Sequence, residues 1–229
     1  MKYIQTIFSA LLISLIVNTS QAIANEKSAG FGYGLYTGPE ISFSFQPESM
    51  FTRFNNRFIL ASSSRNVSET YSETTNSLTQ DAKGEYDYNM SILTYLIDWH
   101  PTDSAFRISF GVAYNNTEIN YVRTGKYTYV VDGITVLRDL TAKADIQFGS
   151  SNIAPYLGLG VGTDLQDVKG LKFDMGVGVY YIGPSEVKTL EFSDGITANI
   201  NQEEAEKDIT KDIVEYLPHV HLGFSYKFY

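Results

Sequence analysis

The chain contains three histidines, the side chains most suited to catalysis or metal binding. His219 and His221 are two residues apart, so an extended strand would place both on one face. A zinc site needs a third protein ligand. On the strand assignment developed below, His100 belongs to the opposite end of the fold, roughly 25 Å away. We therefore expect no metal site and no cofactor.

Nucleophilic catalysis requires a serine within reach of a histidine. Serines are abundant in the chain, so the proximity of one of them to His221 would carry little information. The sequence also has no His-x-Ser strand motif. We therefore expect no catalytic residues and no enzymatic activity.

Two-residue alternation of apolar and polar side chains identifies the elements that position these residues. In residues 106–115, for example, large apolar residues alternate with Arg107, Ser109 and small residues. Such alternation predicts strands with one apolar face. Similar alternation occurs in residues 30–46, 86–92, 106–115, 157–162, 171–181 and 219–228. Six strands of this kind are hard to bury in a water-soluble core, whereas a membrane barrel has lipid outside and a polar lumen inside.

The first 24 residues predict a secretory signal peptide. Lys2 precedes an apolar run over residues 7–17, and Ala22-Ile23-Ala24 is a small-x-small cleavage site. The apolar run is too short for a spanning helix, which needs roughly 20 residues. We expect cleavage after Ala24 and one barrel domain in residues 25–229. The chain has no cysteine, which agrees with export but does not prove it.

The expected fold is all-β: a transmembrane antiparallel up-and-down barrel of eight strands with long acidic extracellular loops. We place strands near residues 28–36, 39–46, 51–63, 85–98, 105–121, 152–163, 171–183 and 216–229. Short periplasmic turns then fall at residues 47–50, 100–104 and 164–170, and long outer loops at 64–84, 122–151 and 184–215. Ten strands is the alternative, because residues 140–148 also alternate; we treat them as an outer extension of the sixth strand. Asp132-Gly133 is a hairpin signal that predicts a small β-ribbon in the second long loop.

Charged and imidazole side chains lie in the inward phase of these strands. An eight-stranded barrel is just wide enough to be filled by its own side chains, so opposite charges would pair inside it. The structural interpretation is an ion-paired plug that closes the lumen, and the functional interpretation is a narrow polar path through it. The lumen-facing candidates are Glu40, Arg107, Lys172, Asp174, His219, His221 and Lys227.

The last long loop, residues 184–215, is strongly acidic. It has nine acidic residues and three lysines, a net charge of −6. A negative mouth concentrates cations, although solubility or cation bridging to lipopolysaccharide explains the charge equally well. Residues 202–214 are also candidates for a short helix. The acids that we expect at the mouth are Glu203, Glu204, Glu206 and Asp208.

The last strand has aromatic residues at positions 224, 226 and 228 in one phase. Outer-membrane barrels commonly end in such a strand, which the assembly machinery reads. The runs NIAPYLGLGVG (152–162), GVGVYYIGPSEVKTLEF (176–192) and YLPHVHLGFSYKFY (216–229), with DWHP at 98–101 and FRISFGVAYNN from 106, resemble the CarO-type ornithine-uptake porin family and, more distantly, OmpW-like barrels. The likeness covers roughly residues 86–229. It implies an outer-membrane barrel with a role in the passage of small basic amino acids, and no family binding residue is carried over.

Three function classes follow from this sequence. The first is a narrow channel for small cationic or zwitterionic solutes such as basic amino acids. The second is a non-conducting structural or surface-interaction barrel, and the third and weakest is a lipid-modifying enzyme. The expected partners are outer-membrane lipid, lipopolysaccharide and the barrel-assembly machinery, with the protein as a monomer. The net charge of −9, or −10 once Lys2 is removed, argues against nucleic acid.

Overall fold

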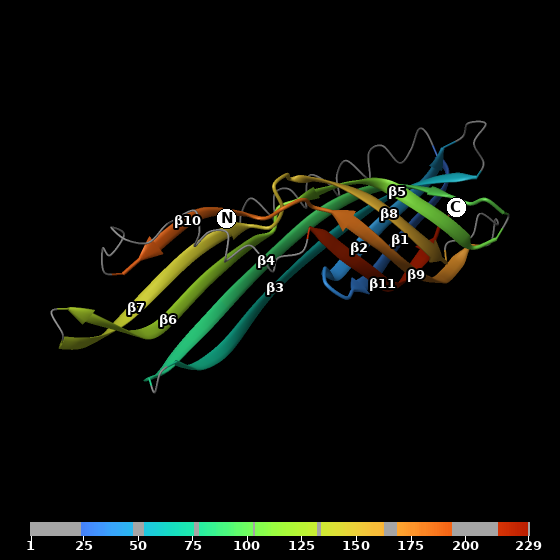
Figure 1. Cartoon of the computed structure of the whole chain (residues 1–229). Helices are drawn as coiled ribbons and strands as arrows, with labels where there is room; N and C mark the ends of the chain where they lie inside the picture. Colours follow the sequence, from blue (N-terminus) through green and yellow to red (C-terminus); the bar gives the residue numbers. More distant parts are fainter. Residues whose placement is uncertain are drawn as a thin grey trace, which may run out of the picture.

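The computed structural model describes residues 24–47, 53–75, 78–102, 104–131, 134–162, 169–193 and 215–228. These residues form eleven strands, all paired antiparallel (Figure 1). The strands are β1 (Ala24–Gly34), β2 (Gly38–Pro47), β3 (Phe54–Thr75), β4 (Leu78–Trp99), β5 (Phe106–Asn115), β6 (Glu118–Val131), β7 (Ile134–Gln147), β8 (Ile153–Val161), β9 (Gly170–Tyr181), β10 (Glu186–Phe192) and β11 (Tyr216–Lys227). Among these residues, no helix is long and apolar enough to cross a bilayer.

Eight of the strands close into a ring. The ring order is β1-β2-β3-β4-β5-β8-β9-β11, and β11 returns to β1 through a register that runs from Ser28↔Lys227 to Gly34↔His221. We call the end of the barrel at Ser28 and Lys227 the proximal end, and the end at the β1–β2 turn the distal end. The eight-stranded barrel predicted from the sequence is confirmed, and the ten-stranded alternative is wrong.

The other three strands form a sheet that extends from the distal end of the barrel (Figure 1). Strand β4 pairs with β5 in the ring from Trp99 to Ile92, and then with β6 from Asn89 to Ala82. Strand β7 pairs with β6, and β10 pairs with β7. We call the five-stranded wall β10-β7-β6-β4-β3 the distal sheet. Residues 140–147 therefore lie in β7, outside the ring.

The distal sheet corrects four sequence assignments, one of which is the predicted loop 184–215, where residues 186–192 form β10. Residues 64–84 are not an open loop, because β3 and β4 stay paired from Phe54↔Trp99 to Thr75↔Leu78. The strand predicted over 105–121 is interrupted at residues 116–117, where β5 ends and β6 begins. The predicted loop 122–151 is the β6–β7 hairpin, whose last described pair is Val131↔Ile134. This pair flanks the Asp-Gly signal and agrees with the predicted ribbon.

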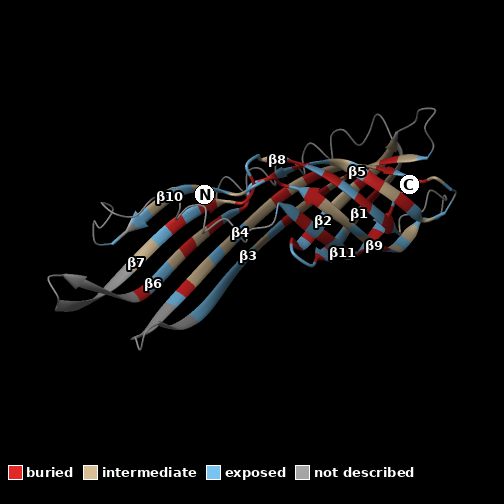
Figure 2. Cartoon of the chain, in the orientation of Figure 1, coloured by how far each residue is buried: buried red, intermediate tan, exposed pale blue. Residues whose placement is uncertain are grey.

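The barrel has an apolar outer surface and buried charged side chains inside it, the reverse of a water-soluble protein. Phe31 and Leu157 project outward with 69% and 60% of their surface exposed, whereas the inward Arg107 is 2% exposed. Figure 2 shows buried and exposed residues alternating along the ring strands. An exposed apolar belt around an interior that contains buried charges is expected of a barrel that spans a membrane.

The distal sheet is held by a different pattern of contacts. Tyr86 on β4 packs against Tyr121 on β6, with ring centroids 4.6 Å apart. Ile119 and Ile146, a register pair on β6 and β7, are 3% exposed. These contacts give the sheet an apolar face of its own.

Candidate functional site: the lumen of the barrel

The lumen contains a bidentate ion pair between Arg107 on β5 and Asp174 on β9. Arg107 Nη1 donates to Asp174 Oδ2 at 2.9 Å, and Nη2 donates to Oδ1 at 2.8 Å. Strand β8 separates these two strands, and Gly160 on β8 leaves room for the guanidinium. A Cβ at position 160 would lie 2.8 Å from Arg107 Nη2. The glycine therefore positions the ion pair.

A second arginine and a second aspartate extend this network. Arg57 on β3 donates through Nη2 to Asp98 Oδ1 on β4 at 3.0 Å, and its Nη1 lies 3.6 Å from Asp174 Oδ1. Ser109 donates its hydroxyl to Asp98 Oδ1 at 2.5 Å. Because the side chains of Arg57, Asp98 and Asp174 are at most 9% exposed, these charges interact with one another far more than with water.

The third part of the lumen contains Glu40 on β2 with His219 and His221 on β11. The distance from Glu40 Oε1 to His219 Nε2 is 2.8 Å, and Glu40 Oε2 contacts His221 Nδ1. The Thr37 hydroxyl donates to Glu40. His221 Nε2 lies 3.2 Å from Asp174 Oδ1, so Asp174 connects the histidines to the arginines. We call these seven residues (Glu40, Arg57, Asp98, Arg107, Asp174, His219 and His221) the lumen network.

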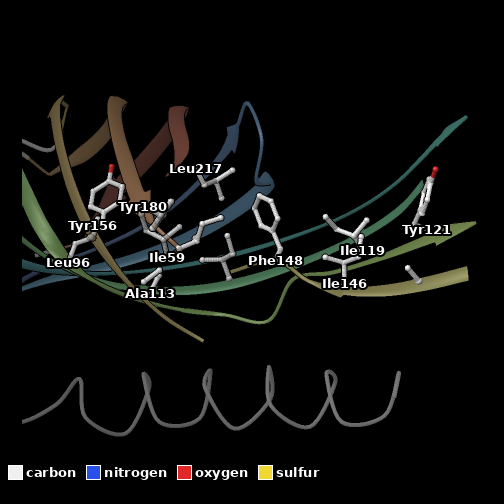
Figure 3. Packing of buried hydrophobic residues seen from close by; sticks show 14 residues of the cluster. Ile59, Leu96, Ala113, Ile119, Tyr121, Ile146, Phe148, Tyr156, Tyr180 and Leu217 are labelled. Atoms are coloured by element: carbon white, nitrogen blue, oxygen red, sulfur yellow. The ribbon is translucent and has the colours of Figure 1, made fainter. Parts of the chain in front are cut away.

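Apolar side chains fill the distal part of the lumen next to this network. Tyr156 on β8 and Tyr180 on β9 pack with ring centroids 4.7 Å apart. Around them lie Ile59, Leu96 and other inward residues that are almost completely buried (Figure 3). The hydroxyl of Tyr156 is 3.3 Å from His219 Nδ1, which places the tyrosine pair directly against the histidines. The lumen is thus occupied by an ion-paired layer and an apolar layer.

The structure brings five of the seven lumen candidates from the sequence into one network: Glu40, Arg107, Asp174, His219 and His221. Lys227 is 2% exposed at the proximal end. Lys172 is half-buried, in register with Ser225. The four mouth acids (Glu203, Glu204, Glu206 and Asp208) and the candidate helix 202–214 lie outside the described residues, as do residues 1–23 of the expected signal peptide.

Sequence reasoning missed Arg57, Asp98 and Tyr156. Arg57 alternates with the outward Phe58, so a reading of the phase in residues 54–61 would have placed it inside. Asp98 ends a predicted strand in the inward phase of Leu96. The alternation of side chains shows which residues point inward, but it does not show which of them contact one another across the ring. Those contacts depend on the relative register of strands that are not neighbours.

The contacts of the histidines bear on catalysis. His219 has Glu40 at one ring nitrogen and Tyr156 at the other. His221 has Glu40 at Nδ1 and Asp174 at Nε2. A general base for a serine needs a ring nitrogen that faces the hydroxyl. Both nitrogens of each histidine are already engaged by carboxylates or a phenol, which favours a structural role over nucleophilic catalysis.

Comparisons with solved structures identify the fold. The chain is similar to Acinetobacter baumannii CarO, with a TM-score of 0.50, 18% identity, and coverage of 91% of this chain and 99% of that chain. It is similar to Acinetobacter baumannii CarO2, with a TM-score of 0.52, 17% identity, and coverage of 90% and 99%. A major outer membrane protein from Thermus thermophilus matches with a TM-score of 0.44, 15% identity, and coverage of 89% and 98%. No protein-family model and no curated protein sequence matches. The chain therefore has a CarO-like barrel fold.

Proposed function

We propose that this CarO-like chain is an outer-membrane barrel whose lumen is closed by its own side chains, and that it serves as a structural and surface-interaction protein. Export through the signal peptide of residues 1–24 and insertion by the barrel-assembly machinery are part of this proposal. The apolar outer belt supports membrane insertion, because exposed Phe31 and Leu157 would otherwise face water.

The observation that carries the proposal is the two-layer filling of the lumen. A conducting pore contains a continuous water-filled path, and a charged side chain that is hydrated does not need an oppositely charged partner. Here Arg107 is 2% exposed and bound to Asp174 at both terminal nitrogens. Leu96 and Thr94, which face the apolar layer and Tyr180, are 0% exposed. These contacts support a closed barrel, in which paired charges offset the cost of burying each of them.

The distal sheet supplies the surface that such a barrel would present. It extends the paired length of β3 and β4 well beyond the ring. Exposed polar side chains follow β3 on both faces of this sheet, with Ser64 and Asn66 on one face and Arg65 on the other. This polar surface suits contact with water and lipopolysaccharide.

Planar-bilayer conductance tests the proposal directly. The refolded wild-type protein should give no steady conductance. The variant Arg57→Ala/Asp98→Ala/Tyr156→Ala/Tyr180→Ala should conduct, because it removes both members of an ion pair together with the two rings of the apolar layer, and so opens space in both layers without an uncompensated charge. The control is Lys83→Ala, an exposed residue of the distal sheet, which should stay silent.

A steadily open wild-type protein would overturn the closed barrel and favour the narrow cation channel. In that case liposome swelling should show faster entry of lysine than of a neutral solute of similar size. Neutralising Glu203, Glu204, Glu206 and Asp208 should then slow lysine alone, because only a charged solute responds to the potential of the mouth.

Cell fractionation tests the location. The mature protein should separate with the outer membrane, begin at Asn25 and show heat-modifiable gel migration. Recovery as a soluble periplasmic monomer would contradict the membrane assignment. An N-terminal sequence that begins before Asn25 would contradict the predicted cleavage.

A further inference from the structure

The sequence gives the two histidines no third ligand, but the structure supplies one. Glu40 lies between them, and the potential ligand atoms of Glu40, His219 and His221 are all within 4.8 Å of one another. Each carboxylate oxygen faces a different imidazole. We propose that Glu40, His219 and His221 form a binding site for a divalent transition-metal ion, with Zn²⁺ as the representative occupant.

The ligand set and its dimensions fit this class of ion. Two imidazoles and one carboxylate are the protein ligands of many zinc sites that keep a fourth position open. Metal–ligand distances of about 2.0–2.1 Å in a tetrahedron put ligand atoms ~3.3 Å apart. The Glu40–His219 contact is 2.8 Å, and the longest separation in the cluster is below 4.8 Å. Side-chain shifts on the order of 1 Å would therefore bring all three ligands around one ion.

The groups behind the histidines already have the arrangement of a metal site. A ligating histidine usually donates its other ring N–H to a carboxylate or another oxygen, which fixes the ring and the tautomer. His221 has Nε2 at 3.2 Å from Asp174 Oδ1, with Nδ1 facing Glu40. His219 has Nδ1 at 3.3 Å from the Tyr156 hydroxyl, with Nε2 facing Glu40. Both rings are thus oriented with one nitrogen toward the carboxylate of Glu40.

Glycines on β1 provide the space that the cluster occupies. A Cβ on Gly32 would overlap the ring of His221, and one on Gly34 would overlap Thr37 and the carboxylate of Glu40. All three proposed ligands are buried, with 2% exposure for Glu40 and His219 and 6% for His221. A buried set of convergent ligands excludes competing water and increases the attraction for a cation.

The test uses the full-length protein without an affinity tag, refolded in detergent, stripped with a chelator and equilibrated with ZnCl₂. Elemental analysis should give one zinc per barrel. CoCl₂ in place of zinc should give the visible absorption of a low-coordinate cobalt site. His219→Gln and His221→Gln should each lose the metal and the cobalt spectrum. The matched control is His100→Gln, which removes the third histidine outside the cluster and should keep both.

Tyr156→Phe provides a milder variant in case the ligand substitutions prevent folding. It keeps the ring and removes only the hydroxyl behind His219, so zinc affinity should fall by about 10-fold or more. The proposal is overturned if the wild-type protein retains no zinc, if His219→Gln and His221→Gln both retain it, or if His100→Gln loses it. A metal-free wild-type protein would mean that Glu40 joins the histidines through protons alone. None of these outcomes depends on whether the barrel conducts.

Discussion

The Arg107–Asp174 pair allows a quantitative test of how dry the lumen is. Its closest contact, 2.8 Å between Nη2 and Oδ1, corresponds to a gross attraction of about 6 kcal/mol at an effective dielectric constant of about 20. Desolvation consumes much of this attraction. The loss of one partner leaves the other charge buried with only its more distant neighbours in the lumen network, so Asp174→Asn and Arg107→Gln should each reduce the free energy of unfolding by about 3–5 kcal/mol.

The double variant Arg107→Gln/Asp174→Asn separates the interaction from the individual losses. Because the second substitution removes a charge that has already lost its bidentate partner, we expect a coupling energy of about 3 kcal/mol. Urea unfolding in phospholipid vesicles measures all four proteins. Trp99, the single tryptophan, provides the fluorescence signal and lies at the end of β4.

The exposed pair Lys83–Glu85 serves as the control. Its side chains are 56% and 45% exposed, so Lys83→Gln should cost less than about 1 kcal/mol. If Asp174→Asn and Arg107→Gln cost no more than this control, or if their effects simply add, then water screens the pair. The lumen would then be wet, and the inference of a closed barrel would fail.

Three further predictions test the belt, the packing and the end of the barrel. Phe31→Arg should reduce the free energy of unfolding in vesicles by about 2–4 kcal/mol, because it puts a charge in lipid. Ser68→Arg, at an exposed position of β3 in the distal sheet, should change it by less than about 0.5 kcal/mol. Equal costs would contradict the lipid-facing assignment. Gly160→Ala should reduce the free energy of unfolding by about 1–3 kcal/mol through overpacking. Gly176→Ala should reduce it by less, because the nearest neighbour of the added Cβ would be 3.3 Å away. The reverse order in urea unfolding would refute the packing argument. Deletion of residues 228–229 should leave the protein aggregated or degraded in the periplasm, as followed by fractionation and immunoblotting, and normal insertion would show that the last strand has been misread.

Two-residue periodicity predicted the ring well, because every ring strand has lipid on one side and the lumen on the other. It therefore assigned Arg107, Asp174 and His221 to the interior without any knowledge of the partners. The partners were harder to predict, because contacts across the lumen depend on the stagger of eight strands. Asp174 illustrates this, since it contacts residues on β3, β5 and β11 while its strand, β9, pairs with β8 and β11 only.

The distal sheet was missed because it lacks the periodicity of a lipid-facing strand. Residues 62–75 are mostly serine, threonine and charged residues, a composition that predicts a loop when it is read alone. Their strand conformation comes from pairing with β4, which no local pattern in this segment reveals. The alternation of residues 140–148 was correctly detected, but periodicity alone does not distinguish a ring strand from a strand that packs in water.

Strands β3 and β4 have a mechanical consequence because each runs for 22 residues without interruption. At about 3.3 Å per residue this is a two-stranded ribbon ~70 Å long. The proximal part of this ribbon belongs to the ring and its distal part belongs to the distal sheet. The pairing between the two strands is continuous from Phe54↔Trp99 to Thr75↔Leu78, so there is no hinge between the two parts. The tilt of the barrel in the bilayer thus sets the direction in which the distal sheet projects. A pull on the tip would be transmitted along β4 to Asp98, at the base of the lumen network.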